Sequence, residues 1–244
     1  MAPCGRPWEV SGRVLTSDSF LASHSKSIRG PTLSTASLTR LPKAERTRRQ
    51  ILASAERRFA AAGFEKTRLD DVADDIGMVG SAILYHFPDK RALYGAVRDD
   101  LTAALLGAIE EAIAKPAPPR ERLVELVRAA TRTIVARPTI AAIVLREAMS
   151  DQPDIGARSE PILDHVVELF EEGARSGGIR PVHADPYLFF TSIAGAILYT
   201  VAVLPAVLDE RRDGPPADGS AHRLEREAVA IARRLLGLRE PQPG

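Results

Sequence analysis

The chain has 244 residues, of which 45% are hydrophobic and 27% charged, so it can bury a core and is typical of a globular protein. Its single cysteine, Cys4, excludes a disulfide framework and any zinc site built from several cysteines. The net charge is only +1, but residues 1–98 contain 16 Lys and Arg against 10 Asp and Glu, whereas residues 99–244 contain 17 against 22. This asymmetry predicts that the front of the chain meets a polyanion.

Residues 1–42 differ in composition from the rest of the chain. They are rich in Ser, Thr, Gly and Arg, contain only two acidic residues and show no helical apolar period, which predicts a disordered basic arm. They lack the apolar stretch of a secretory signal. The same Ser- and Arg-rich composition also fits an organelle transit peptide, so that alternative stays open.

Residues 43–62 are predicted to form a basic amphipathic helix. Apolar residues recur there at helical spacing, arginines occupy the remaining faces, and Gly63 ends the helix. Thr67, with an acid three places further on, is the predicted N-cap of a second, short helix that Gly77 ends. A third short helix follows, so residues 43–92 have the arrangement of a helix-turn-helix domain, whose last helix enters the major groove of DNA.

This third helix presents two kinds of side chain. Ile83 and Phe87 are one turn apart and can face the same core. The residues that then point away from the core are Gly80, Ser81, Leu84 and Tyr85, with His86 at the margin. A serine hydroxyl can bond a base edge, a glycine permits close approach, and a tyrosine hydroxyl or an imidazole N–H can bond a phosphate oxygen. Lys90 adds a cation beside a helix N-terminus that already favours phosphate.

An ordered set of residues carries a family resemblance. Its members are Gly63, Phe64, Thr67, Leu69, Asp71, Val72, Ala73, Gly77, Ile83, His86, Phe87, Lys90, Leu93 and Val97. In this order and spacing they resemble the TetR family of transcriptional regulators. The resemblance implies an all-helical homodimer with an N-terminal helix-turn-helix domain and a larger C-terminal domain that binds a small molecule and dimerises.

The resemblance also implies roles for single residues. It implies phosphate contacts by Thr67 and Arg68, base reading by Val79, Gly80 and Ser81, and backbone contacts by Tyr85, His86 and Lys90. One residue departs from the family pattern, because Leu84 stands where members most often have a phosphate-bonding Tyr.

Residues 93–240 are predicted to form the helical ligand-binding and dimerisation domain. An apolar period that starts at Leu93 has no breaker before Pro116, which predicts one long helix joining the two domains. Further helices are expected near residues 120–136, 138–150 and 158–176. The candidate ligand-binding residues are Arg146, Phe170 and Phe190. The Arg146 charge interrupts an apolar run, where it either bonds a ligand's polar end, bridges helices or is solvated.

Residues 186–208 contain no charged residue in 23 positions, a length that could span a membrane. Thr191, Ser192 and Tyr199 make the stretch less apolar than a typical membrane helix. A helix that is apolar all round can instead be buried by its own domain and by a partner subunit. Together with the amphipathic residues 221–238, this segment is the predicted homodimer interface, and a membrane helix is the alternative.

The sequence contains no catalytic motif. Its five histidines are scattered, and neither HExxH, GxSxG nor a phosphate-cradling glycine loop occurs, so we expect no enzyme activity, metal site or cofactor. We predict an all-α, cytoplasmic, dimeric DNA-binding regulator, most simply a repressor that a small molecule releases from its operator. The alternative is a helical small-molecule-binding or membrane-associated interaction protein that does not act at DNA. Salt-dependent binding to a palindrome would separate the two.

Overall fold

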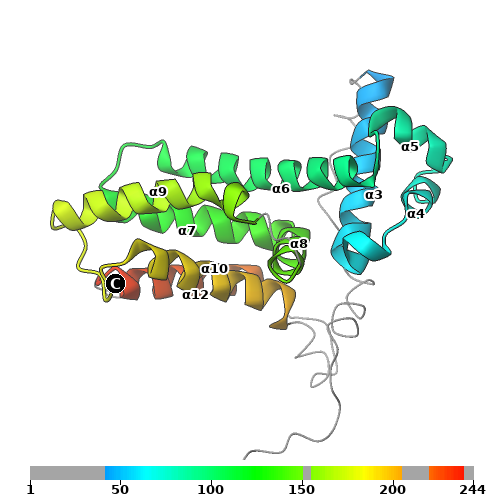
Figure 1. Cartoon of the computed structure of the whole chain (residues 1–244). Helices are drawn as coiled ribbons and strands as arrows, with labels where there is room; N and C mark the ends of the chain where they lie inside the picture. Colours follow the sequence, from blue (N-terminus) through cyan, green and yellow to red (C-terminus); the bar gives the residue numbers. More distant parts are fainter. Residues whose placement is uncertain (1–41, 151–154, 205–219, 239–244) are drawn as a thin grey trace, which may run out of the picture.

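The computed structural model describes residues 42–150, 155–204 and 220–238, and every regular element in these ranges is an α-helix (Figure 1). The helices are α3 (Lys43–Lys66), α4 (Leu69–Asp74), α5 (Gly80–His86), α6 (Lys90–Ile113), α7 (Pro119–Ala136), α8 (Thr139–Ala148), α9 (Ile155–Arg175), α10 (Pro186–Ala202) and α12 (Ser220–Leu235). The predicted all-α fold is confirmed.

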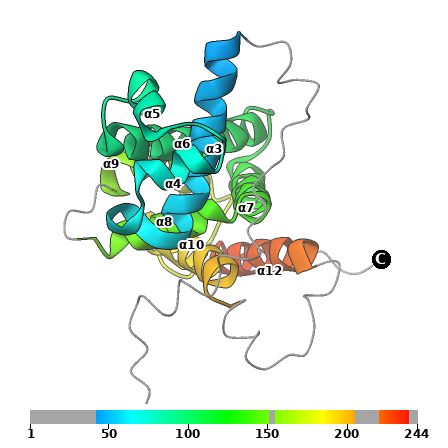
Figure 2. The ribbon, with the colours of Figure 1, turned by 90° about the vertical axis from the view of Figure 1, so that its right-hand side faces the viewer.

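Helices α3, α4 and α5 form a helix-turn-helix unit at one end of the molecule, which faces the viewer in Figure 2. Gly63 has a φ of 80° and interrupts α3, although the chain makes a further turn to Lys66. Gly77, with a φ of 68°, forms the turn between α4 and α5. Both values lie in the left-handed region that glycine adopts without a Cβ penalty. The unit buries Ile51, Phe59, Val72, Ile83 and Phe87.

Helix α6 connects this unit to the rest of the protein. Its N-cap is Asp89, whose carboxylate accepts a hydrogen bond from the backbone N–H of Ala92 at 2.7 Å. The first turns pack on α3, because the Tyr94 ring lies 4.8 Å from that of Phe59 and 5.2 Å from that of Phe64, measured between centroids. The later turns bury apolar side chains among the remaining helices. The predicted long connecting helix is confirmed.

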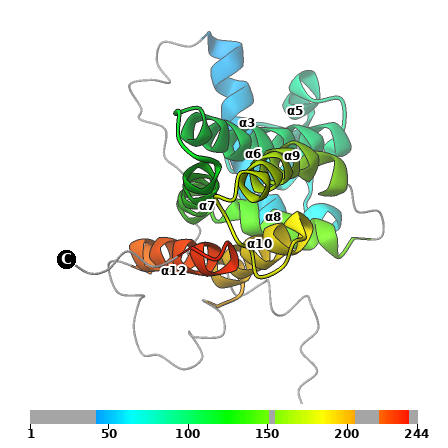
Figure 3. The same ribbon diagram turned by 90° about the vertical axis from the view of Figure 1, so that its left-hand side faces the viewer.

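The body of the protein consists of α6 to α10 and α12. Helices α10 and α12 lie side by side along one edge of this bundle (Figure 3). Helix α10 buries Phe189, Ile193 and Ile197 against the body, but Tyr187, Leu188 and Tyr199 stay about half exposed. This edge therefore presents apolar side chains that the subunit itself does not cover.

Other local predictions have different outcomes. The prediction that Thr67 caps α4 is wrong, because Arg68 is the N-cap residue and the Thr67 hydroxyl instead donates to the Gly63 carbonyl at 2.7 Å. In the described part of the chain, no helix has both the length and the apolar character needed to cross a membrane. The predicted arm, up to residue 41, and residues 205–208 of the predicted interface segment lie outside the described residues.

Candidate functional site

Helix α4 is fixed on α3 by one carboxylate. Asp75, which follows α4, accepts hydrogen bonds from the Ser54 hydroxyl at 2.7 Å and from Nε of Arg58 at 2.9 Å. The Arg58 guanidinium lowers the pKa of the Asp75 carboxyl, and the Ser54 hydroxyl acts in the same direction. The charged carboxylate therefore holds α4, and with it the start of α5, in a defined position on α3.

Helix α5 has one buried and one exposed face. Ile83 and Phe87 are buried, whereas Val79 is 68%, Leu84 47% and Tyr85 87% exposed. The predicted directions are therefore confirmed for the inward Ile83 and Phe87 and for the outward Leu84 and Tyr85. Gly80, predicted to point outward, faces α4 instead. Ser81 is exposed and His86 half-buried, and the His86 ring packs edge to face against that of Tyr85. A further cation lies at the C-terminal end of this helix, because the Arg48 guanidinium is 4.6 Å from the centre of the Phe87 ring.

Gly80 has a specific role in the contact between α4 and α5. A Cβ atom at this position would lie 2.1 Å from Oδ1 of Asp70, so the absence of a side chain leaves the space that the Asp70 carboxylate occupies. Arg68 lies 3.5 Å from the same carboxylate and is mostly exposed. The sequence indicated that Gly80 lets DNA approach closely; in the structure it first of all lets the two helices approach.

Thr67 and Lys90, two of the predicted backbone contacts, make hydrogen bonds within the unit. The Lys90 ammonium donates to the carbonyls of Phe64 at 2.9 Å and Glu65 at 3.3 Å, and it lies 4.4 Å from the centre of the Phe64 ring. Thr67 is buried, with its hydroxyl on the Gly63 carbonyl. Both side chains thus fix the end of α3, and their contacts with phosphate stay predictions.

A buried network joins the helix-turn-helix unit to the body. Glu56 of α3 accepts hydrogen bonds from Nε of Arg137 at 2.9 Å and from the Thr139 hydroxyl. Arg137 also donates to Asp100 of α6 at 2.6 Å. Burial alone would lower the pKa of Arg137, but its hydrogen bonds to Glu56 and Asp100 outweigh burial and raise it. The Arg137 charge therefore links α3, α6 and the turn between α7 and α8.

A second contact connects α8 to α3. The Arg146 guanidinium donates to the carbonyls of Ala60 at 3.1 Å and Ala61 at 2.6 Å. The next residue, Glu147, is buried and accepts hydrogen bonds from the Tyr94 hydroxyl at 2.8 Å and from Arg98. Burial and the hydrogen bond to Glu147 both raise the pKa of Tyr94, which stays a neutral donor. Of the possibilities left open for Arg146, the structure shows the bridge between helices.

A cavity of about 70 Å³ lies between α6, α8 and α9. Its apolar lining consists of Leu101, Leu105, Ile140, Ile143, Val144 and Ile162. Its polar lining consists of Arg98, Thr102, Glu147, Arg158 and Ser159. A ligand in this cavity would therefore contact Glu147. Glu147 follows Arg146, the residue that donates hydrogen bonds to α3.

The other two residues predicted to bind a ligand lie elsewhere. Phe170 is buried, with its ring centre 5.8 Å from that of Phe189, and Phe190 packs partly buried against the core. Neither of them, nor Arg146, lines this cavity. Ligand binding by these three residues stays a prediction; in the structure their side chains take part in packing or in the α3 contact.

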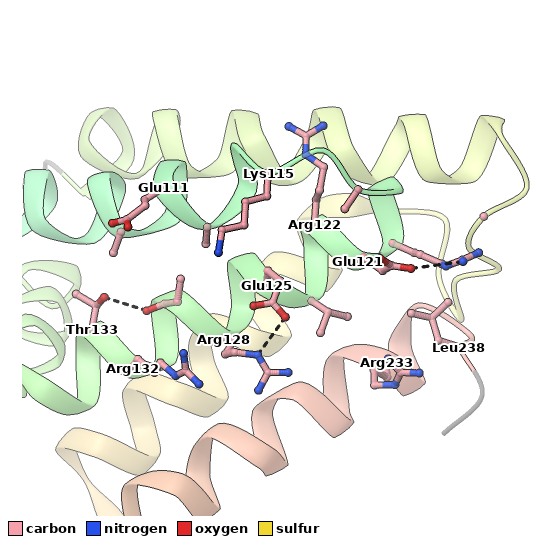
Figure 4. A pocket seen from close by; sticks show the side chains of 17 residues that line it. Glu111, Lys115, Glu121, Arg122, Glu125, Arg128, Arg132, Thr133, Arg233 and Leu238 are labelled. Carbon is pink, nitrogen blue, oxygen red and sulfur yellow. Dashed lines mark hydrogen bonds and ion pairs between the residues drawn. The ribbon is translucent and has the colours of Figure 1, made fainter. Parts of the chain in front are cut away.

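A larger groove of about 970 Å³ lies between α6, α7 and the end of α12 (Figure 4). Many of its charges neutralise one another. Arg128 bonds Glu125 at 3.2 Å and Glu225 at 2.8 Å, and Arg132 also bonds Glu225 at 2.8 Å. Arg122 donates to the Ile113 carbonyl at 2.9 Å. These arginines therefore hold α7 against α12 and α6.

The Glu56 network and the lining of the cavity were not predicted from the sequence. The one signal for the network was an acid at position 56, next to Ala55 on the apolar face of the first helix. Its partner Arg137 is 81 residues away, so no local spacing could identify the pair. The contact between α8 and α3 did have a signal in the sequence, namely the charged pair Arg146-Glu147 inside an apolar run. The role of Arg146 was left open there.

The helix-turn-helix unit matches a known protein family. The profile of the family described as "Bacterial regulatory proteins, tetR family" matches residues 51–97. The transcriptional repressor KstR2 of Mycolicibacterium smegmatis is 27% identical over 139 residues, which cover 55% of this chain and 68% of the relative.

Two solved structures share the fold. The regulator FadR from Bacillus subtilis in complex with stearoyl-CoA has a TM-score of 0.61 at 18% identity, covering 78% of this chain and 99% of that one. AibR in complex with isovaleryl coenzyme A and operator DNA has a TM-score of 0.62 at 22% identity, covering 79% and 99%. The outward-facing α5, the matched residues 51–97 and the similar repressor lead to one conclusion: the chain carries the DNA-binding domain of the TetR family and is a DNA-binding transcriptional regulator.

Proposed function

We propose that the chain is a homodimeric repressor that leaves its operator when a small molecule occupies the cavity between α6, α8 and α9. One observation carries this proposal. Glu147 lines the cavity, and the residue before it in α8, Arg146, donates hydrogen bonds to two carbonyls of α3. A ligand that changes the position of α8 thereby acts on the helix that carries the DNA-binding unit. It can do so only to the extent that it binds one position of α8 more tightly than the other.

The DNA side of the proposal follows from exposure. Base contacts are assigned to Val79, Gly80 and Ser81 at the start of α5, and phosphate contacts to Arg68, Tyr85 and His86 around it. Thr67 and Lys90 support these contacts by fixing the end of α3, and the Lys90 charge adds to the attraction of phosphate. Residues 43–92 would form the DNA-binding domain and residues 93–240 the ligand-binding and dimerisation domain, acting in the cytoplasm where operator DNA is reached.

The proposed subunit interface is the α10 and α12 edge of the body. The half-exposed apolar side chains Tyr187, Leu188 and Tyr199 would be covered there by the same helices of a second subunit. A dimer is needed because two recognition helices about 34–36 Å apart can enter successive major grooves, whereas a single subunit offers one.

The cavity also limits the effector. A volume of about 70 Å³ holds about five water-sized groups, which fits a short aliphatic group and excludes a long acyl chain without rearrangement. Arg98 and Arg158 in its lining suit an anionic or strongly polar remainder, which would compete with their bonds to Glu147 and Asp99. Since proteins of this fold occur in complex with stearoyl-CoA and isovaleryl coenzyme A, we propose a short branched acyl-CoA as the effector class.

The test is release of operator DNA by defined ligands. Operator fragments selected from random duplex DNA are labelled, and their binding is followed by fluorescence anisotropy with isovaleryl-CoA, stearoyl-CoA or free coenzyme A. We expect release by isovaleryl-CoA only. Val144→Phe, which fills the cavity, should bind the operator but ignore the ligand, while Ala129→Phe in the large groove should respond as wild type does. Equal release by free coenzyme A, or release retained in Val144→Phe, would contradict the proposed site.

A further inference from the structure

Val79 occupies a position that folding alone does not explain. It is the N-cap residue of α5, makes no side-chain cap hydrogen bond and is 68% exposed. Valine is among the poorest N-cap residues because it has no acceptor for the first-turn amides. An exposed valine also gains little from burial, since hydrophobic stabilisation is proportional to the apolar area removed from water. Neither capping nor packing within the subunit accounts for an apolar side chain at this place.

The surroundings of Val79 direct it toward base edges. Val79 projects into solvent from the start of α5, next to a residue without a side chain, Gly80. The Asp70 carboxylate lies against this first turn, where a Cβ on Gly80 would be within 2.1 Å of it. A carboxylate repels phosphate but is tolerated opposite base edges, where it can accept a hydrogen bond from a cytosine amino group. The start of α5 is therefore suited to the floor of a groove and unsuited to the DNA backbone.

Only one standard base offers an apolar group in the major groove, namely thymine with its 5-methyl group. We propose that Val79 contacts the 5-methyl group of one thymine in each operator half-site and is a specificity-determining residue. This inference rests on the proposed function, because it requires α5 to enter the major groove.

The test removes the methyl group from the DNA. Operators are selected from random duplex DNA with the wild-type protein, and each thymine of the half-site is replaced in turn by deoxyuridine, which differs only in the 5-methyl group. At one position the replacement should weaken binding about fourfold per half-site, the factor that corresponds to one buried methyl group. In a symmetric operator with both half-sites replaced, the loss should be about 15-fold.

Variants assign the effect to this residue. Val79→Ala should bind the thymine operator as weakly as wild type binds the deoxyuridine operator, with no further loss on combining the two changes. Val79→Ser supplies a capping oxygen and should fold at least as stably, yet be equally insensitive to the methyl group. Leu84→Ala is the matched control: it truncates another exposed apolar side chain of α5 and should leave the deoxyuridine penalty intact.

The outcomes separate this inference from the function on which it rests. Enriched operators without a methyl-sensitive thymine, or a deoxyuridine penalty that persists in Val79→Ala, would overturn the Val79 contact and leave the repressor proposal standing. A failure to enrich any sequence from the random pool would overturn the repressor proposal itself, and the Val79 contact with it.

Discussion

Arg137→Met should lower the free energy of unfolding strongly, because it removes one partner of a buried ion pair. The side chains of Arg137 and Glu56 are only 15% and 9% exposed, and the substitution leaves the Glu56 carboxylate buried with the Thr139 hydroxyl as its remaining bond. Removing one partner of a buried ion pair costs about 3–5 kcal/mol, and the remaining bond to Thr139 favours the lower end, about 3 kcal/mol. The bond to Asp100 adds little, because that carboxylate is half exposed.

The free energy of unfolding is measured by urea denaturation at one fixed protein concentration, since a dimer's stability depends on concentration. The double variant Glu56→Met with Arg137→Met removes both charges and should recover to within about 1 kcal/mol of wild type. Arg49→Met is the control, because its ion pair with Glu45 is 45% and 43% exposed and is worth at most about 0.5 kcal/mol. A loss below about 1 kcal/mol in Arg137→Met, or a double variant as unstable as the single one, would refute the assigned network.

The remaining predictions concern pH, assembly and coupling. Because the pKa of Asp75 is lowered in the folded protein, its ion pair contributes stability above the unfolded-state pKa of about 3.9 and loses it as pH falls through the folded value. Asp75→Asn should thus be less stable at neutral pH and less sensitive to acid, and an unchanged acid dependence of thermal unfolding would count against the Arg58 contact. Leu188→Arg should give a folded monomer in sedimentation velocity, since the side chain is 49% exposed within the subunit. Leu84→Arg, at a similarly exposed leucine on α5, at the opposite end of the molecule from the α10 and α12 edge, should stay dimeric; a dimeric Leu188→Arg protein would exclude this interface. Arg146→Met should still bind the operator but respond less to isovaleryl-CoA, and an undiminished response would argue against α8 as the route of coupling.

Local signals predicted the helices well. Apolar periodicity and the punctuation by Gly63, Gly77 and Pro116 placed each helix of the helix-turn-helix unit and the long α6 close to its observed bounds. The inward direction of Ile83 and Phe87 was predictable for the same reason, because residues one turn apart share a face of a helix.

Contacts between distant residues could not be predicted in this way. Thr67 is of a residue type that often caps helices, but its hydroxyl bonds the Gly63 carbonyl four residues earlier, and Arg68 is the N-cap residue. Arg146, a charge within an apolar run, is of a type that often binds a ligand, but in the folded chain it donates to two carbonyls near the end of α3. Only the folded chain brings Arg146 near its partners, whereas the Thr67 hydroxyl has two local partners to choose between, so in both cases the residue type did not determine the role.

The central claim is that two α5 helices read successive major grooves of a palindromic operator. It is tested most directly by the dissociation constant for a selected operator and for the same operator with five base pairs inserted between its half-sites, which turns one half-site by about half a helical turn. If the dimer reads both half-sites at once, the insertion should weaken binding by about 100-fold or more, because the avidity of the second recognition helix is lost. Equal affinity for the two operators would contradict the account.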